Sequence, residues 1–191
     1  FEKVCELLAR RMQEGKAIFP VSVNLSRQHF KDPDFLRQFS EIADKYHIPD
    51  GILELELTES IFFDDQGIEF VEKCIHRMHR LGFKCSLDDF GSGYSSLGLL
   101  REFDVDTIKL DRRFFLDISQ PKAEDVLICL TELGRRLGVQ IVAEGIETQE
   151  QIAFLKRVRC DMVQGYFYSR PLPAEEFWEW LEKRREGEGN Q

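Results

Sequence analysis

The sequence predicts an α/β fold in which short strands alternate with longer helices. Apolar, β-rich runs are separated by amphipathic stretches, and two of these stretches are followed by a glycine, Gly82 and Gly138, a residue at which helices commonly end. Regular alternation favours a mostly parallel sheet with helices outside it. Two layouts remain open at this point, an open doubly wound sheet and a closed eight-stranded barrel. No GxGxxG follows the first predicted strand, which weakens the dinucleotide-binding form of the open sheet.

The predicted elements follow one another in a consistent order. The chain opens on an amphipathic helix over residues 1–12 with no capping residue or initiator methionine before it, so we expect a piece of a longer polypeptide. Strands are predicted at residues 17–24, 53–57, 83–88, 107–110, 139–143 and 162–166. Further helices are predicted at residues 34–46, 66–81, 94–103, 124–137, 148–158 and 174–183. We therefore expect one domain over residues 1–183 and a polar tail over residues 184–191.

Composition limits the classes of function. The chain has 191 residues, 42% of them hydrophobic and 32% charged, which is an ordinary globular balance. Its net charge of -9 argues against a nonspecific DNA or RNA surface, which would be basic. A phosphate-bearing substrate remains compatible, because bound divalent cations can invert the local charge.

Cysteine usage and hydropathy indicate where the protein works. Five scattered cysteines with no CxxC pair are typical of reduced thiols, so we expect a cytoplasmic domain. No apolar run is long enough to span a bilayer and no signal peptide opens the chain. A membrane anchor elsewhere in the parent protein is compatible with this expectation.

Polar side chains collect where the predicted strands end. In chain order these positions are Asn24, Glu56 with Glu59 after it, the pair Asp88 and Asp89, Lys109 with Asp111, Glu144 with Glu147, and Gln164. In a parallel barrel the carboxyl ends of the strands form one rim, where barrel enzymes place their chemistry. A helix N-cap would explain any one of these residues as well, but six strands in succession favour a shared site.

The residue types on this rim indicate a metal site. Several carboxylates close together repel one another unless cations lie between them. Oxygen donors without Cys or His suit Mg²⁺ or Mn²⁺ better than zinc. Two such ions about 4 Å apart stabilise the attacking and leaving oxygens of a phosphodiester, and a lysine beside them can orient water and offset developing charge. The rim therefore predicts metal-dependent phosphodiester hydrolysis.

Six motifs carry these polar residues: NLS at 24–26, ELTES at 56–60, DDFGSGYSSL at 88–97, DTIKLDR at 106–112, EGIET at 144–148 and QGYFYSRPLP at 164–173. Together they resemble the EAL domain of bacterial cyclic di-GMP phosphodiesterases. Their order and spacing match from the first residue to about residue 180, and the DDFGSGYSSL string is highly specific. The resemblance implies a (β/α)8 TIM-type barrel that is incomplete at the N-terminus, because the Glu-Ala-Leu signature and its metal-binding glutamate would precede Phe1.

The resemblance also implies a reaction and its ligands. The reaction would be hydrolysis of cyclic di-GMP to linear pGpG by a water that two divalent cations, Mg²⁺ or Mn²⁺, activate. Asn24, Glu56 and Asp88 would bind one ion, and Asp88, Asp89 and Glu144 the other. Lys109 would lie beside the nucleophilic water, Glu144 would help to deprotonate it, and Gln164 would complete the rim.

Further positions receive supporting roles from the resemblance. Glu59 resembles the glutamate that holds the loop from Phe90 to Leu97, and Gly91, Ser92 and Gly93 would let that loop bend over the site. Ser92 stands where the family usually has Thr. Glu147 would support the ligands from behind. After the fourth strand and Asp111, Arg112 and Arg113 follow on the rim side, where one of them could reach a phosphate or guanine or form a surface ion pair.

Partners and alternatives complete the expectations. The family analogy implies a homodimer fused to other signalling domains, such as GGDEF or sensor domains, and no DNA or RNA polymer as partner. An alternative function is an EAL-like domain that has lost turnover and binds cyclic di-GMP as a sensor. A third is an interaction domain that uses the barrel only as a scaffold. The rim carboxylates present in this sequence favour catalysis.

Overall fold

A single parallel sheet forms the centre of the protein. The computed structural model describes residues 1–58, 61, 67–91, 98–116, 118 and 120–188. The strands are β1 (Val21–Asn24), β2 (Leu53–Thr58), β3 (Lys84–Phe90), β4 (Thr107–Leu110), β5 (Gln140–Ala143) and β6 (Met162–Val163). They pair in the order of the chain, and every neighbouring pair is parallel.

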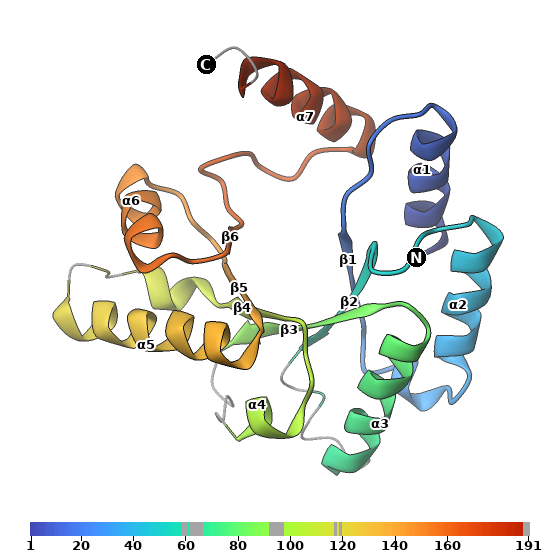
Figure 1. Ribbon diagram of the computed structural model, residues 1–191, viewed down its shortest axis with the longest axis horizontal. Helices are drawn as coiled ribbons and strands as arrows, with labels where there is room; N and C mark the ends of the chain where they lie inside the picture. The colour runs from blue at the N-terminus through green and yellow to red at the C-terminus, as the bar shows by residue number, and fades with distance from the viewer. Residues whose placement is uncertain (59–60, 62–66, 92–97, 117, 119, 189–191) are drawn as a thin grey trace.

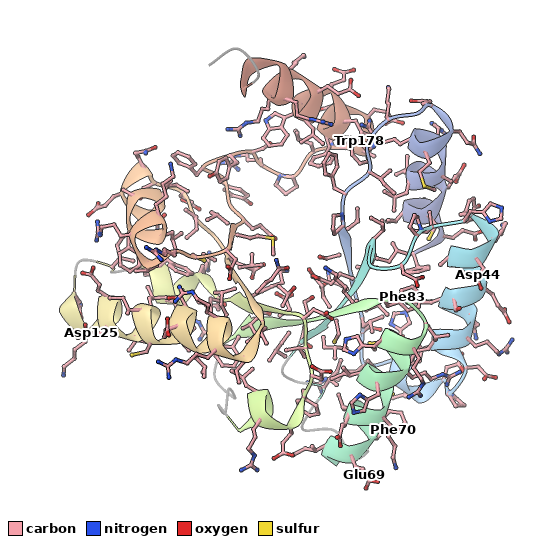
Figure 2. The ribbon with its side chains drawn as sticks, in the orientation of Figure 1. Asp44, Glu69, Phe70, Phe83, Asp125 and Trp178 are labelled. Carbon is pink, nitrogen blue, oxygen red and sulfur yellow. The ribbon has the colours of Figure 1, made fainter. Side chains whose placement is uncertain are left out.

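Helices surround the outer side of this curled sheet (Figure 1). They are α1 (Glu2–Gln13), α2 (Phe35–Lys45), α3 (Gly67–Arg80), α4 (Leu99–Glu102), α5 (Pro121–Leu137), α6 (Gln149–Val158) and α7 (Ala174–Glu188), with 3₁₀ helices η1 (His29–Lys31) and η3 (Arg112–Phe115). Charged residues such as Asp44, Glu69 and Asp125 lie on the outward faces of the helices and are exposed (Figure 2). The arrangement is the TIM-type α/β barrel architecture that strand–helix alternation predicts.

Several boundaries differ from the predicted ones. β1 begins at Val21 rather than at residue 17, directly after Pro20, which has no N–H for a strand ladder. α5 begins three residues early, at Pro121, because proline is well suited to the first turn of a helix. β6 is only Met162–Val163, and α7 continues to Glu188, through part of the predicted tail. The two 3₁₀ helices were not predicted.

Helix ends follow the local chemistry of the sequence. Gly138 ends α5 in the left-handed conformation, with φ 74°, which a residue without Cβ adopts at little cost. Thr148 begins α6 with a capping box, in which its hydroxyl accepts from the Gln151 N–H while the Gln151 side chain accepts from the Thr148 N–H. No helix among the described residues is both long and apolar enough to cross a membrane.

The two faces of the strands have different chemistry. On β2, Leu53, Leu55 and Leu57 belong to the apolar core, with exposures of 2%, 0% and 0%. Successive strand residues point to opposite faces, so Glu54 and Glu56 lie on the other, concave face. The apolar layer holds the helices against the sheet, and the concave face is left for polar groups.

Gly165 connects this concave face to the chain that follows β6. A Cβ at this position would overlap the backbone oxygen and nitrogen of Ile146. We expect Gly165→Ala to lower the free energy of unfolding by about 3 kcal/mol, because backbone atoms cannot move aside as a flexible side chain can. Urea denaturation with tryptophan fluorescence would measure the change.

The matched control is Gly138→Ala. This residue also has no Cβ, but open space surrounds it, so the change costs only the left-handed backbone conformation, about 1 kcal/mol. Equal losses in the two variants would contradict a tight contact between Gly165 and Ile146.

Candidate active site

The carboxyl ends of all six strands meet at one cavity of about 530 Å³. Each strand, or the residue directly after it, contributes a polar side chain to its wall: Asn24, Glu56, Asp88, Lys109, Glu144 and Gln164, and β1 adds Ser22. These residues are separated by up to 140 positions in the chain, from 24 to 164. The parallel register places them together, because it puts every carboxyl end at the same edge of the sheet.

Lys109 is the centre of this group. Its Nζ lies 2.9 Å from Glu56 Oε1, 3.2 Å from Asp88 Oδ1 and 2.9 Å from Glu144 Oε1. Lys109 is 6% exposed and Glu56 5%. Burial alone would lower the pKa of Lys109, but the hydrogen bonds to Glu56 and Glu144 outweigh it and raise the pKa above its ordinary value. Lys109 is therefore an ammonium at neutral pH.

One ammonium does not compensate three carboxylates. Burial raises the pKa of Glu144; Lys109 opposes this effect, while the charges of Asp88 and Glu56 add to it. The site thus retains an excess of negative charge in a poorly solvated place. Additional cations would relieve it.

Asp89 joins this group through a local irregularity of β3. Adjacent strand residues normally point to opposite faces, but the β3–β4 register shifts between Leu87 and Phe90, and Asp89 has a left-handed φ of 57°. Its N–H donates to Asp88 Oδ1 at 3.0 Å. As a result, one carboxylate oxygen from each of Asp88, Asp89 and Glu144 lies within 4.8 Å of the others. Burial and the charge of Asp88 raise the pKa of Asp89.

The donor set fits a hard divalent cation. Asp88, Asp89 and Glu144 offer carboxylate oxygens, and Asn24 and Glu56 add an amide and a further carboxylate in the cavity that Asp88 and Glu144 also line. No cysteine or histidine is among the residues that line this cavity in the described part of the chain. Oxygen ligands of this kind suit Mg²⁺ or Mn²⁺.

The remaining predicted residues lie in other surroundings. Asp111 caps η3, where it accepts hydrogen bonds of 2.8 Å from the backbone N–H and from Nε of Arg113. Burial favours a higher pKa for Asp111, but these Arg113 contacts prevail and lower it. Arg112 and Glu147 line a second cavity next to the first.

Three predicted residues lie outside the described part of the chain: Ser92 and Gly93 of the predicted loop, and Glu59, which was expected to hold that loop. Gly91 is described, with φ 93°, and the Phe114 ring occupies the place where a Cβ would lie. Glycine at this position is therefore explained by close packing and by its backbone conformation.

The second cavity, of about 850 Å³, was not predicted from the sequence. It shares Pro20, Gln164 and Phe177 with the first cavity and is lined by aromatic and basic side chains, among them Arg112, Tyr166, Tyr168, Arg170 and Trp180. The Arg184 guanidinium lies over two rings, 5.1 Å from the Tyr168 centroid and 5.0 Å from the Trp180 centroid. The sequence signal that could have predicted this cavity is the spacing of the aromatic residues in YFYSR, residues 166–170.

A polar layer beneath the rim was also missed. The layer consists of a polar residue two positions before a rim residue on each of β1 to β4: Ser22, Glu54, Ser86 and Thr107. Glu54, Ser86 and Thr107 are buried, whereas Ser22 is exposed to the first cavity. The alternation of Glu54 and Glu56 within LELEL was the sequence signal, because residues two apart on a strand share a face.

Comparison with known proteins agrees with this geometry. The EAL domain family model matches residues 1–171. The cyclic di-GMP phosphodiesterase NbdA of Pseudomonas aeruginosa is 33% identical over 186 residues, which is 96% of this chain and 23% of that protein. This chain spans only 20% to 23% of the length of the first three curated relatives it matches.

Solved structures give the same result. The EAL domain of Mycobacterium smegmatis DcpA superposes with a TM-score of 0.86 at 31% identity, over 95% of this chain and 82% of that one. BlrP1 of Klebsiella pneumoniae, described as a manganese and cyclic di-GMP complex, superposes with a TM-score of 0.78 at 27% identity, over 89% and 43% of the two chains. The match of sequence and fold over nearly the whole chain shows that this protein belongs to the EAL domain family.

Proposed function

We propose that this EAL domain hydrolyses one phosphodiester bond of cyclic di-GMP and releases linear pGpG, with two divalent cations, Mg²⁺ or Mn²⁺, as cofactors. The observation that carries the proposal is the convergence of four carboxylates, two amides and a lysine at the carboxyl ends of the strands. Cyclic di-GMP as substrate is supported by the names of the relatives NbdA and BlrP1.

The ligands divide into two sets around Asp88. Asp88, Asp89 and Glu144 would hold one ion, and Asn24, Glu56 and Asp88 the other. Bound divalent cations supply Lewis-acid polarisation of the phosphoryl oxygens and lower the pKa of water. The excess negative charge around Lys109 supports such a pair of ions, since it favours cations over any other ligand.

The chain's own residues do the rest of the chemistry. The Lys109 ammonium would donate hydrogen bonds to the oxygens on which negative charge develops. Glu144 would accept the proton of the attacking water, and its raised pKa makes it a stronger base than an ordinary carboxylate. Gln164 would orient that water with its side chain. The backbone of Gln164 is fixed, because its backbone N–H donates to Ala143 O at 2.8 Å and its backbone carbonyl accepts from the Ile146 N–H at 3.2 Å.

The second cavity suits the remainder of a dinucleotide. It adjoins the carboxylate cavity, and aromatic faces such as Tyr168 and Trp180 can stack on a purine base. Arg112 lines this cavity, as does Gln164, which supports a contact of Arg112 with a phosphate or guanine. We retain the supporting roles that the resemblance implies for six further residues: Glu59, Gly91, Ser92, Gly93, Asp111 and Glu147.

The setting of the domain belongs to the same proposal. We infer that the domain is part of a longer signalling protein, because the relatives are several times longer than this chain. The homodimer is proposed from family analogy, and the cytoplasmic location from the scattered cysteines. A sensor that binds cyclic di-GMP without turnover is the alternative that the experiments below separate.

Asp88→Asn tests the shared ligand. The change keeps the shape of the side chain but removes the charge that would serve both ions, so we expect kcat with Mg²⁺ to fall by about 1,000-fold. Product release from cyclic di-GMP, followed by chromatography, measures this. Asp125→Asn, an exposed change on α5, is the control and should keep full activity. Wild-type full-length protein that binds cyclic di-GMP but never releases product with Mg²⁺ would establish the sensor alternative.

Lys109→Met tests the role of the ammonium. We expect kcat to fall by about 100-fold or more while the dissociation constant for cyclic di-GMP changes only a few-fold, since the lysine acts on the developing charge. Calorimetric titration with nucleotide, alongside turnover, separates the two quantities. Lost binding with unchanged turnover of the bound substrate would refute the role given to Lys109.

The raised pKa values of Glu144 and Asp89 predict the pH dependence. A raised pKa means that these carboxyls bind protons at a higher pH than ordinary ones, and a protonated carboxyl is a poor metal ligand. Activity should therefore fall as the pH falls, and higher Mg²⁺ should move the acid limb to lower pH. Rate profiles at two Mg²⁺ concentrations check this; coincident limbs would contradict it.

A further inference from the structure

The layer beneath the rim repeats the layout of the site above it. On each of β1 to β4 a polar residue lies two positions before the rim residue: Ser22 before Asn24, Glu54 before Glu56, Ser86 before Asp88 and Thr107 before Lys109. Ser22 is paired in register with Glu54, and Ser86 with Thr107. Residues two apart on a strand point to the same face, so each of these residues lies below the rim residue of its own strand. Between β2 and β3 the register is offset, because Ser86 pairs with Glu56.

Glu54 connects this layer across the sheet. Its Oε1 accepts a hydrogen bond from Ser22 Oγ at 2.8 Å, and its Oε2 accepts one from Thr107 Oγ1 at 3.0 Å. Glu54 is 8% exposed and Thr107 1%. Both oxygens of a buried carboxylate are thus occupied by hydroxyls from two other strands.

The bond to Thr107 depends on the curvature of the sheet. β3 lies between β2 and β4, and strands two apart would be separated by about 10 Å in a flat sheet. Glu54 can reach Thr107 only because the sheet curls toward its concave face. The carboxylate therefore acts as a strut that fixes how far β1, β2 and β4 bend toward one another.

The chemistry of the layer argues for more than packing. A buried carboxylate is a costly way to fill space, and apolar side chains of similar volume would generally be at least as stable. Ser86 is fully buried, and its hydroxyl has no hydrogen-bond partner in the described part of the chain, which is a further cost. Polar groups kept at such a cost, directly under metal-type ligands, indicate a role in the site.

We infer that Glu54 is a positioning residue, which through Ser22 and Thr107 sets the separation of Asn24, Glu56 and Lys109 and thereby the affinity of the rim for divalent cations. The inference rests on the proposed metal site. Residues behind metal ligands commonly tune affinity in this way, because ligand geometry must hold within fractions of an ångström.

Mn²⁺ affinity of the full-length protein, measured by electron paramagnetic resonance of free Mn²⁺ without nucleotide, tests this. Glu54→Met keeps the length of the side chain but removes both acceptors, and should weaken Mn²⁺ binding by about 10- to 100-fold. Glu54→Gln can accept from one hydroxyl and donate to the other, and should remain close to wild type. Thr107→Val removes one of the two bonds and should give a smaller loss.

The double variant separates this pathway from general destabilisation. Glu54→Met combined with Thr107→Val should bind Mn²⁺ no more weakly than Glu54→Met alone, because Glu54→Met has already removed the hydrogen bond through which Thr107 acts. Thr131→Val is the matched control: it removes a buried hydroxyl on α5 that donates to Leu127 O and Ile128 O, and it should leave Mn²⁺ affinity unchanged.

Three results would overturn the inference. Glu54→Met that folds, as judged by circular dichroism, with wild-type Mn²⁺ affinity would leave Glu54 a purely structural residue while the proposed function stands. Glu54→Gln as weak as Glu54→Met would mean that charge, not the strut, sets the affinity. A wild-type protein that does not bind Mn²⁺ would remove both this inference and the proposed function. Should Glu54→Met not fold, Thr107→Val and Ser22→Ala decide: weaker binding supports the strut and unchanged binding refutes it.

Discussion

The site depends on a balance of buried charge. Glu56, Asp88 and Glu144 lie within 2.9–3.2 Å of a single ammonium, that of Lys109, at a place with little access to solvent. Carboxylates brought this close would repel one another strongly without a cation. Lys109 provides the first positive charge and leaves a deficit that suits divalent metal ions. The same balance explains why burial raises the pKa of Glu144, while at Lys109 the hydrogen bonds to and charges of Glu56 and Glu144 together outweigh burial and raise the pKa.

The parallel sheet makes this balance possible. Each strand carries apolar residues toward the helices and polar residues toward the concave face, as β2 shows with its alternating leucines and glutamates. The curl of the sheet then converts a row of strand ends into a ring around a cavity. In this way packing energy from the apolar layer holds charged groups together on the opposite face, where they would otherwise separate.

Much of this arrangement could be predicted from the sequence. Periodicity and helix-ending glycines indicated nearly every helix and strand, and the strand-end rule was enough to select Asn24, Glu56, Asp88, Lys109, Glu144 and Gln164, which line one cavity. β1 starts later than predicted, because Pro20 has no N–H to donate to the neighbouring strand, although the residues around it are β-rich. The hydrogen bond from Thr107 to Glu54 could not be predicted from the sequence, since it links strands that are not adjacent and depends on the curvature of the sheet. The second cavity, with its aromatic lining, likewise lies between α7 and the segment after β6. No local sequence pattern predicts how these two segments are placed relative to each other.

The register shift at Asp89 has a consequence for how such a chain can change over evolutionary time. Because one residue is absorbed there, Phe90 returns to the core beside Leu110 while both aspartates face the same side. Loss of a single residue from this short segment would restore a regular strand and turn one carboxylate toward the helices. The number of residues between Leu87 and Phe90 is therefore constrained in descendants of this chain, because deletion of one residue there would undo the arrangement of the two aspartates in a single step.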